Sequence, residues 1–142
     1  MRIYVIRHGH APNGRLSALG REQAARVATE LAGAGIERVA CSQYPRCLHT
    51  IEPLARTLGL DVEVEDALAE DAGLEAMWAY LESLTGTVAV CSHANLLGPV
   101  IDRVVHQGAE VDATAMTCET GSVWRLDGDA AGTFTRAVQQ LR

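Results

Sequence analysis

Short apolar runs alternate with helix-like stretches along this chain of 142 residues, and this order constrains the fold more than any other feature. The runs that predict strands are residues 3–6, 38–42, 61–64, 87–92, 122–126 and 134–138, the last two as a hairpin. The stretches that predict helices lie between them, at residues 18–34, 45–58, 73–84 and 95–105. Strands that alternate with helices form parallel sheets covered on both faces. We therefore expect an α/β fold, a three-layer α/β/α sandwich around a mainly parallel central sheet of about six strands.

Local signals mark the ends of these helices. Ser17 resembles an N-cap before the first helical stretch, and Gly33 and Gly35 close that stretch. Pro45 suits the first turn of the second helix, because proline needs no hydrogen-bonded N–H there. Pro99 predicts either the start of the fourth helix or a kink within it.

The bulk properties indicate one globular domain over residues 1–142. Hydrophobic residues make up 48% of the chain and charged residues 21%, which excludes a disordered composition. A net charge of −6 argues against a nucleic-acid partner or an anionic membrane surface. No apolar stretch approaches the roughly 20 residues of a membrane span. The first strand begins at once, without the pattern of a secretory signal, so we expect a cytoplasmic protein.

Basic residues and cysteines say little by their type. All twelve basic residues are arginine, so residue type alone does not single out one arginine as functional. The cysteines form no CxxC pair and no metal-site spacing; they are Cys41, Cys47, Cys91 and Cys118. Because two of them fall in predicted strands, we expect buried, reduced thiols and no bound metal.

Cationic and imidazole side chains follow three of the predicted strands. Arg7, His8 and Gly9 follow the first, Arg46 follows the second, and His93 follows the fourth. The carboxyl ends of parallel strands share one edge of the sheet, and ligands bind there. Two guanidinium groups, two imidazoles and a helix N-terminus make a pocket suited to a phosphoryl group. The sequence therefore predicts a phosphate site at this edge.

Four stretches of the chain follow one another in the order and with the spacing of a known family: Arg7–Gly9, Leu16–Ala24, Cys41–Thr50 and Val90–His93. In these stretches the chain resembles the histidine phosphatase (phosphoglycerate mutase-like) superfamily. The short chain and the Leu68–Glu70 segment are similar to two subgroups, the phosphohistidine phosphatases and the histidine phosphatase domain appended to some Nudix hydrolases. The resemblance implies a phosphoglycerate mutase-like fold and a single histidine phosphatase domain.

The resemblance also implies catalytic roles. His8 would attack phosphorus and carry the phosphoryl group as a phosphohistidine intermediate, which water then hydrolyses. Arg7, Arg46 and His93 would surround the phosphoryl oxygens and stabilise the transition state. These fixed donors would do the electrostatic work, so no metal and no cofactor are expected.

The proton donor to the leaving group is the least determined part of the site. Glu70 is the best positional match to the acid of family members that act on esters, and Asp66 and Asp71 are alternatives. An acid beside a helix N-terminus is the structural alternative for Glu70. An imidazole leaving group would need less help from an acid.

Two further residues are candidates for substrate binding. Asn13 matches an asparagine that contacts phosphate in many relatives, and an ordinary turn residue between Pro12 and Gly14 is the alternative. Ala94 stands where family members usually have glycine; its backbone N–H can still reach a phosphate, with a closer approach of the side chain.

We therefore expect a metal-independent phosphatase that hydrolyses a phosphomonoester or a phosphohistidine. The substrate is a phosphorylated small molecule or a phosphoprotein, and the few insertions predict an open pocket. A non-catalytic phosphate-sensing or protein-binding module is the alternative from another class, although binding alone would not require His8. A phosphomutase is a further alternative, but the chain has no room for the segments that close over a sugar phosphate. The oligomeric state stays open.

Overall fold

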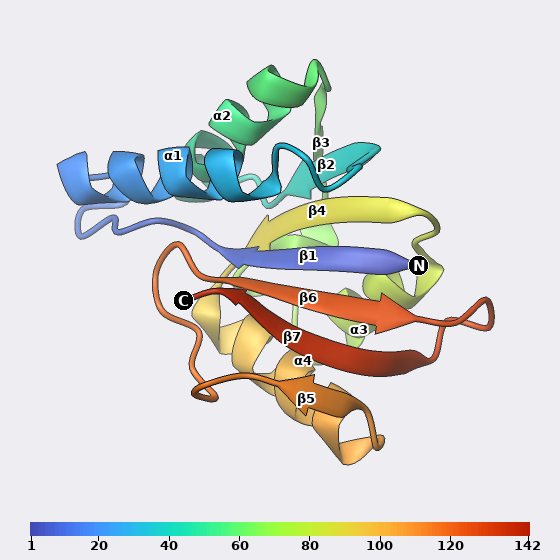
Figure 1. Cartoon of the computed structure of the whole chain (residues 1–142). Helices are drawn as coiled ribbons and strands as arrows, with labels where there is room; N and C mark the ends of the chain where they lie inside the picture. The colour runs from blue at the N-terminus through green and yellow to red at the C-terminus, as the bar shows by residue number, and fades with distance from the viewer.

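The computed structural model describes residues 1–142, which form a twisted sheet with helices on both faces (Figure 1). The strands are β1 (Arg2–Arg7), β2 (Arg38–Cys41), β3 (Val62–Val64), β4 (Thr87–Ser92), β5 (Glu110–Asp112), β6 (Val123–Gly128) and β7 (Phe134–Leu141). The helices are α1 (Ala18–Leu31), α2 (Pro45–Leu58), α3 (Leu74–Ser83) and α4 (Ala94–His106), with a short 3-10 helix, η1 (Asp66–Leu68), before α3.

The sheet has seven strands in the order β3-β2-β4-β1-β6-β7-β5. Four of the six strand pairs are parallel, and the antiparallel pairs are β1 with β6 and β6 with β7. The expected mainly parallel sheet is thus confirmed, with one strand more than predicted. That strand, β5, consists of three exposed residues at the sheet edge. Its three residues, Glu-Val-Asp, are too few for a periodic pattern to identify a strand.

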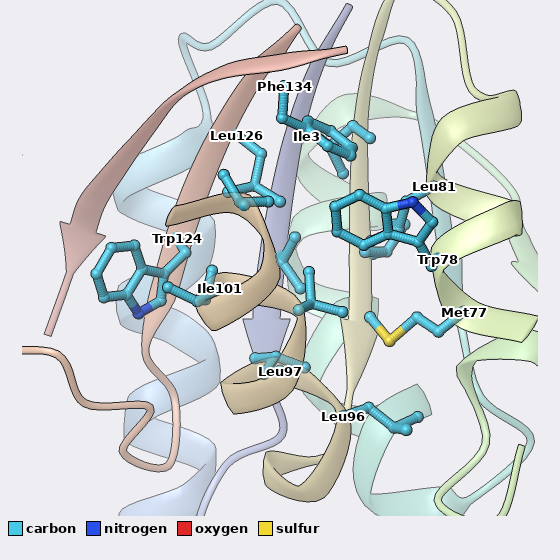
Figure 2. Packing of buried hydrophobic residues seen from close by; sticks show 14 of the residues in the cluster. Ile3, Met77, Trp78, Leu81, Leu96, Leu97, Ile101, Trp124, Leu126 and Phe134 are labelled. Carbon is cyan, nitrogen blue, oxygen red and sulfur yellow. The ribbon is translucent and has the colours of Figure 1, made fainter. Parts of the chain in front are cut away.

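Side chains of the central strands alternate between two hydrophobic clusters, one on each face of the sheet. Ile3 and Val5 of β1 belong to the cluster under α3 and α4, and Tyr4 and Ile6 belong to the cluster under α1 and α2. Figure 2 shows the first cluster, where side chains of α3 and α4 pack against Ile3 and its strand neighbours. Burial on both faces explains why β1 is a continuous apolar run, and it confirms the three-layer α/β/α sandwich.

The helix ends agree with their sequence signals except at the end of α1. The Ser17 side chain accepts a hydrogen bond from the Gly20 N–H at 3.0 Å, as an N-cap does. The helix ends at Leu31, three residues earlier than predicted, because Leu31 is its last buried residue and the exposed Gly33 weakens further helix. Pro99 lies inside α4, which starts at Ala94.

None of the helices combines the length and the apolar character needed to cross a membrane.

Candidate active site

The two histidines meet because β1 and β4 are neighbours in the sheet. Arg7, the last residue of β1, pairs in parallel register with Ser92, the last residue of β4. His8 and His93 are the next residues along each chain segment, and their ring centroids lie 5.3 Å apart in an edge-on arrangement. The structure thus brings the predicted pair of imidazoles together at the carboxyl edge of the sheet.

The His8 ring is oriented by its own neighbour in sequence. Its Nδ1 lies 2.8 Å from the Gly9 carbonyl oxygen, which only accepts, so Nδ1 carries the proton and donates. The other nitrogen, Nε2, then holds a free lone pair. Burial lowers the pKa of His8 below 6.5 and outweighs the hydrogen bond to the Gly9 carbonyl, which raises it; the positive charge of Arg46 lowers it further. His8 is therefore held neutral, the form that acts as a nucleophile.

Gly9 joins the end of β1 to α1 and α2. Its N–H donates to the Thr50 hydroxyl at 2.9 Å, and that hydroxyl donates to the Arg46 carbonyl at 2.6 Å. A Cβ at position 9 would lie 2.7 Å from the Gly20 carbonyl oxygen of α1. Only glycine fits this approach, so the residue after His8 fixes the loop against both helices.

Arg46, in the first turn of α2, reaches across the site. Its Nη2 forms an ion pair with Glu70 Oε2 at 2.6 Å and lies 3.3 Å from Nδ1 of His93. Its guanidinium group stacks over the Tyr44 ring, 4.8 Å from the centroid. The Arg46 side chain is 17% exposed, so part of it is accessible to a ligand.

His93 is almost fully buried at the N-terminus of α4. Since Arg46 can only donate, Nδ1 of His93 accepts, and its Nε2 carries the proton. Nε2 lies 2.9 Å from the Ser42 hydroxyl and 3.5 Å from the Cys47 sulfur. Two side chains from the end of β2 and the start of α2 thus fix the plane of this ring.

Arg7 is anchored by a segment from the other end of the chain. Its Nη1 donates to the Cys118 carbonyl at 2.9 Å, and the Gly121 N–H donates to the Arg7 and His8 carbonyls at 3.1 Å. The Arg7 Nε is buried and has no hydrogen-bond partner. Because an unpaired buried donor is costly, this atom is a natural contact for an oxyanion.

Of the three candidate acids, only Glu70 contacts the site. It lies in the turn that follows η1, where its carbonyl accepts from the Asn95 side chain at 2.7 Å. The Glu70 side chain is 51% exposed and contacts Arg46. Asp66 and Asp71 are exposed and form no ion pair or side-chain hydrogen bond.

The model of the histidine phosphatase superfamily (branch 1) matches residues 3–82 of the chain, which include the first histidine, Arg46 and Glu70. The chain belongs to this superfamily. No curated protein sequence matches it.

Solved structures show the same fold. The protein histidine phosphatase SixA complexed with tungstate is 25% identical, with a TM-score of 0.76 over 99% of this chain and 97% of that chain. The mycobacterial glucosyl-3-phosphoglycerate phosphatase is 16% identical, with a TM-score of 0.64 over 96% and 95%. The alpha-ribazole phosphatase from Shigella flexneri is 19% identical, with a TM-score of 0.66 over 100% and 95%. This member of the histidine phosphatase superfamily is accordingly a phosphoric monoester hydrolase.

The two predicted substrate-binding residues differ in position. Asn13 is exposed in a turn that the Gly14 N–H closes on the Ala11 carbonyl at 3.2 Å, and its side chain forms no hydrogen bond. Ala94 is the first residue of α4, so its N–H has no partner within the helix and forms part of the positive end of the helix dipole.

Sequence reasoning missed three side chains that complete this phosphatase site. Ser42 and Cys47 contact His93, and Asn95 holds the turn that carries Glu70. Hydrogen bonds from Cys91, His93 and Ser42 lower the pKa of the Cys47 thiol to about 5 against the effect of burial. Ser42 and Cys47 lie within the 41–50 stretch. Their nearness to Arg46 in the sequence was the one signal that they belong to the site. All four cysteines are free thiols, as expected.

No group of three or more His, Cys, Asp or Glu side chains is arranged to hold a metal ion.

Proposed function

We propose that this chain hydrolyses a phosphomonoester or a phosphohistidine through a phosphohistidine intermediate on His8, without a metal ion. The observation that carries the proposal is the neutral His8 ring with Nε2 free, 5.3 Å from the His93 ring and beside Arg46. An in-line attack on phosphorus needs a nucleophile with a lone pair and donors around the phosphoryl oxygens. The geometry supports both requirements at one place.

The reaction takes two steps. In the first, His8 Nε2 forms a bond to phosphorus while the bond from phosphorus to the leaving group breaks. In the second, water attacks phosphorus, the P–N bond breaks, and inorganic phosphate leaves. Arg7 and Arg46, with the backbone N–H of Ala94, hold the phosphoryl oxygens during both steps, and His93 joins them as a donor once it takes up a proton on Nδ1.

For ester substrates we assign the proton transfers to Glu70. Its contact with Arg46 supports this role, because phosphoryl oxygens that bind Arg46 replace the Glu70 carboxyl group there. Glu70 then turns to the leaving-group oxygen, delivers a proton in the first step and takes one from water in the second. An imidazole leaving group depends less on this transfer.

The shape of the site favours a phosphoryl group that projects from a large or extended substrate. Four cavities occur in the molecule, and none is lined by His8, Arg46 or His93. The rim of the site at Glu70 is half exposed, while His93 and Arg46 lie deeper, which supports access by a phosphoprotein as well as by a small ester. The similar structures are phosphatases named for different substrates, so the fold alone does not select one.

Quenching in alkaline denaturant after incubation with a phosphorus-labelled donor tests the proposal, because the P–N bond of phosphohistidine survives base and is lost in acid. The wild-type protein should retain label that later acid treatment removes, and His8→Ala should retain none. His106→Ala, at the far end of α4, is the matched control and should label like the wild type. Tight substrate binding without labelling would support a non-catalytic module, and passage of the label to a second hydroxyl group rather than to water would support a mutase.

A further inference from the structure

A cavity of about 400 Å³ lies beside the active site, between α1 and α2. Its floor is apolar, with Leu16, Ala24 and Pro53. The charged and polar groups around it are Arg15, Arg21, His49, Glu52 and Arg56. Three guanidinium groups against one carboxylate leave a formal excess of two positive charges, without counting His49. This excess is local, because the whole chain has a net charge of −6.

The three arginines of this cavity have no carboxylate partner. The ion pairs of the molecule use six other arginines: Arg2, Arg38, Arg46, Arg103, Arg125 and Arg136. Arg21 is nonetheless held in place, because its Nη1 donates to the Leu16 carbonyl at 3.2 Å. Guanidinium groups without a carboxylate partner are the usual recognition groups for phosphate and carboxylate, and Arg21 is the one of the three with a fixed orientation.

The cavity is linked to the His8 loop through neighbouring residues. Leu16, in its floor, packs against Gly9, the residue after His8. His49 follows Arg46 by about one turn on α2, and the next residue, Thr50, bonds to Gly9. The cavity and the loop that carries His8 are therefore adjacent, and an extended substrate with its phosphoryl group at His8 would cross this loop to reach the cavity.

We propose that this cavity binds a second anionic group of the substrate, a phosphoryl group or a carboxylate, and so selects polyanionic phosphorylated substrates. The proposal rests on the phosphatase activity proposed above and adds the class of substrate to it. A phosphoryl dianion matches the two excess positive charges, and the apolar floor suits the linking part of the substrate. The active site needs such a second contact, because a phosphoryl group alone offers little contact area.

The test compares three substrates: phenyl phosphate, a peptide with two phosphoserines, and the same peptide with glutamate in place of one phosphoserine. In the double variant Arg21→Ala/Arg56→Ala, kcat/KM for the doubly phosphorylated peptide should fall about tenfold, and that for phenyl phosphate should stay within about twofold. Glu52→Gln should raise kcat/KM for that peptide about twofold, since it removes the one opposing charge. Added salt should reduce both effects. A larger loss for the peptide with two phosphoserines than for the glutamate peptide identifies a phosphoryl group as the ligand, and equal losses identify any oxyanion.

Arg26→Ala is the matched control, because Arg26 is exposed on α1, forms no ion pair and does not line the cavity. An equal change with all three substrates, or no difference between the double variant and Arg26→Ala, would overturn the proposal. Turnover of phenyl phosphate by the wild type reports on the phosphatase activity alone. Calorimetric binding of the doubly phosphorylated peptide to His8→Ala, with and without the double substitution, tests the cavity even if turnover is absent.

Discussion

Arginines at the two ends of the sheet behave differently. At the amino end of the parallel strands, Arg2 pairs with Asp127 and Arg38 pairs with Glu63, each at 2.7 Å. At the carboxyl end, Arg7 has no carboxylate partner, and Arg46 lies between Glu70 and His93. Since all basic residues are arginine, the residue type carries no information. Two features distinguish the arginines of the site from the structural ones. These are the end of the strands at which they lie and whether an ion pair with a carboxylate occupies them fully.

Removing one cation from each end gives the largest expected contrast. Arg46→Ala should lower kcat about a hundred- to a thousandfold, because a donor to the transition-state charge is lost. Arg38→Ala should leave kcat within about twofold and cost at most about 1 kcal/mol of unfolding free energy, because its ion pair with Glu63 is exposed. Steady-state kinetics and urea denaturation of both variants measure this. Equal kcat values would erase the distinction between the two ends.

The second comparison is between Glu70, an acid at the carboxyl end of the sheet, and Asp71, its neighbour in sequence. Glu70→Gln should lower kcat for phosphate esters about a hundredfold, and for a phosphohistidine peptide much less. Asp71→Asn, one residue further along and without a contact to Arg46, should have little effect on either substrate. The ratio of the two rates is the measurement. A similar loss on both substrates would reduce Glu70 to a residue that positions Arg46.

Two glycines extend the comparison to the backbone. Gly9→Ala should destabilise the protein by about 1–3 kcal/mol, because the added Cβ meets the Gly20 carbonyl at 2.7 Å. Gly33→Ala should be neutral or stabilising by up to about 1 kcal/mol, because nothing lies within 4 Å of its Cβ. Chemical denaturation of both variants gives the two free energies. A tolerated Gly9→Ala would show that α1 can move away from the nucleophile.

The smallest expected effect is a pH dependence. Because burial lowers the pKa of folded His8 below 6.5, the unfolded chain takes up the proton first as the pH falls. The contribution of His8 to the free energy of unfolding is therefore complete above pH 6.5. It is lost as the pH falls from 6.5 through the lower pKa of the folded state. The acid limb of kcat/KM from His8 should likewise lie below pH 6.5. An NMR titration of the His8 ring with a midpoint at or above 6.5 would contradict this.

Sequence patterns predicted the part of this molecule that depends on strand ends. Alternating strands and helices place His8, Arg46 and His93 at one edge, because parallel strands align their carboxyl ends. The short strand β5 and helix η1 were not predicted, because each has only three residues and is too short to show a periodic pattern of apolar residues.

Contacts that depend on register and on turns could not be predicted. Ser42 reaches His93 only because Cys41 and Cys91 are paired across β2 and β4. The choice of Glu70 over its neighbours depends on the turn after η1 and on Asn95, which no spacing rule encodes. The cavity between α1 and α2 combines residues from both helices and the preceding loop, so it exists only after the helices have packed.

The place of β1 in the sheet has a consequence for biosynthesis. On a nascent chain β1 leaves the ribosome ahead of both its neighbours, β4 and β6, and it lies between them in the finished sheet. One edge of its backbone N–H and C=O groups has no strand partner until β6, which ends at residue 128, has been made, and this favours late, cooperative folding of the sheet.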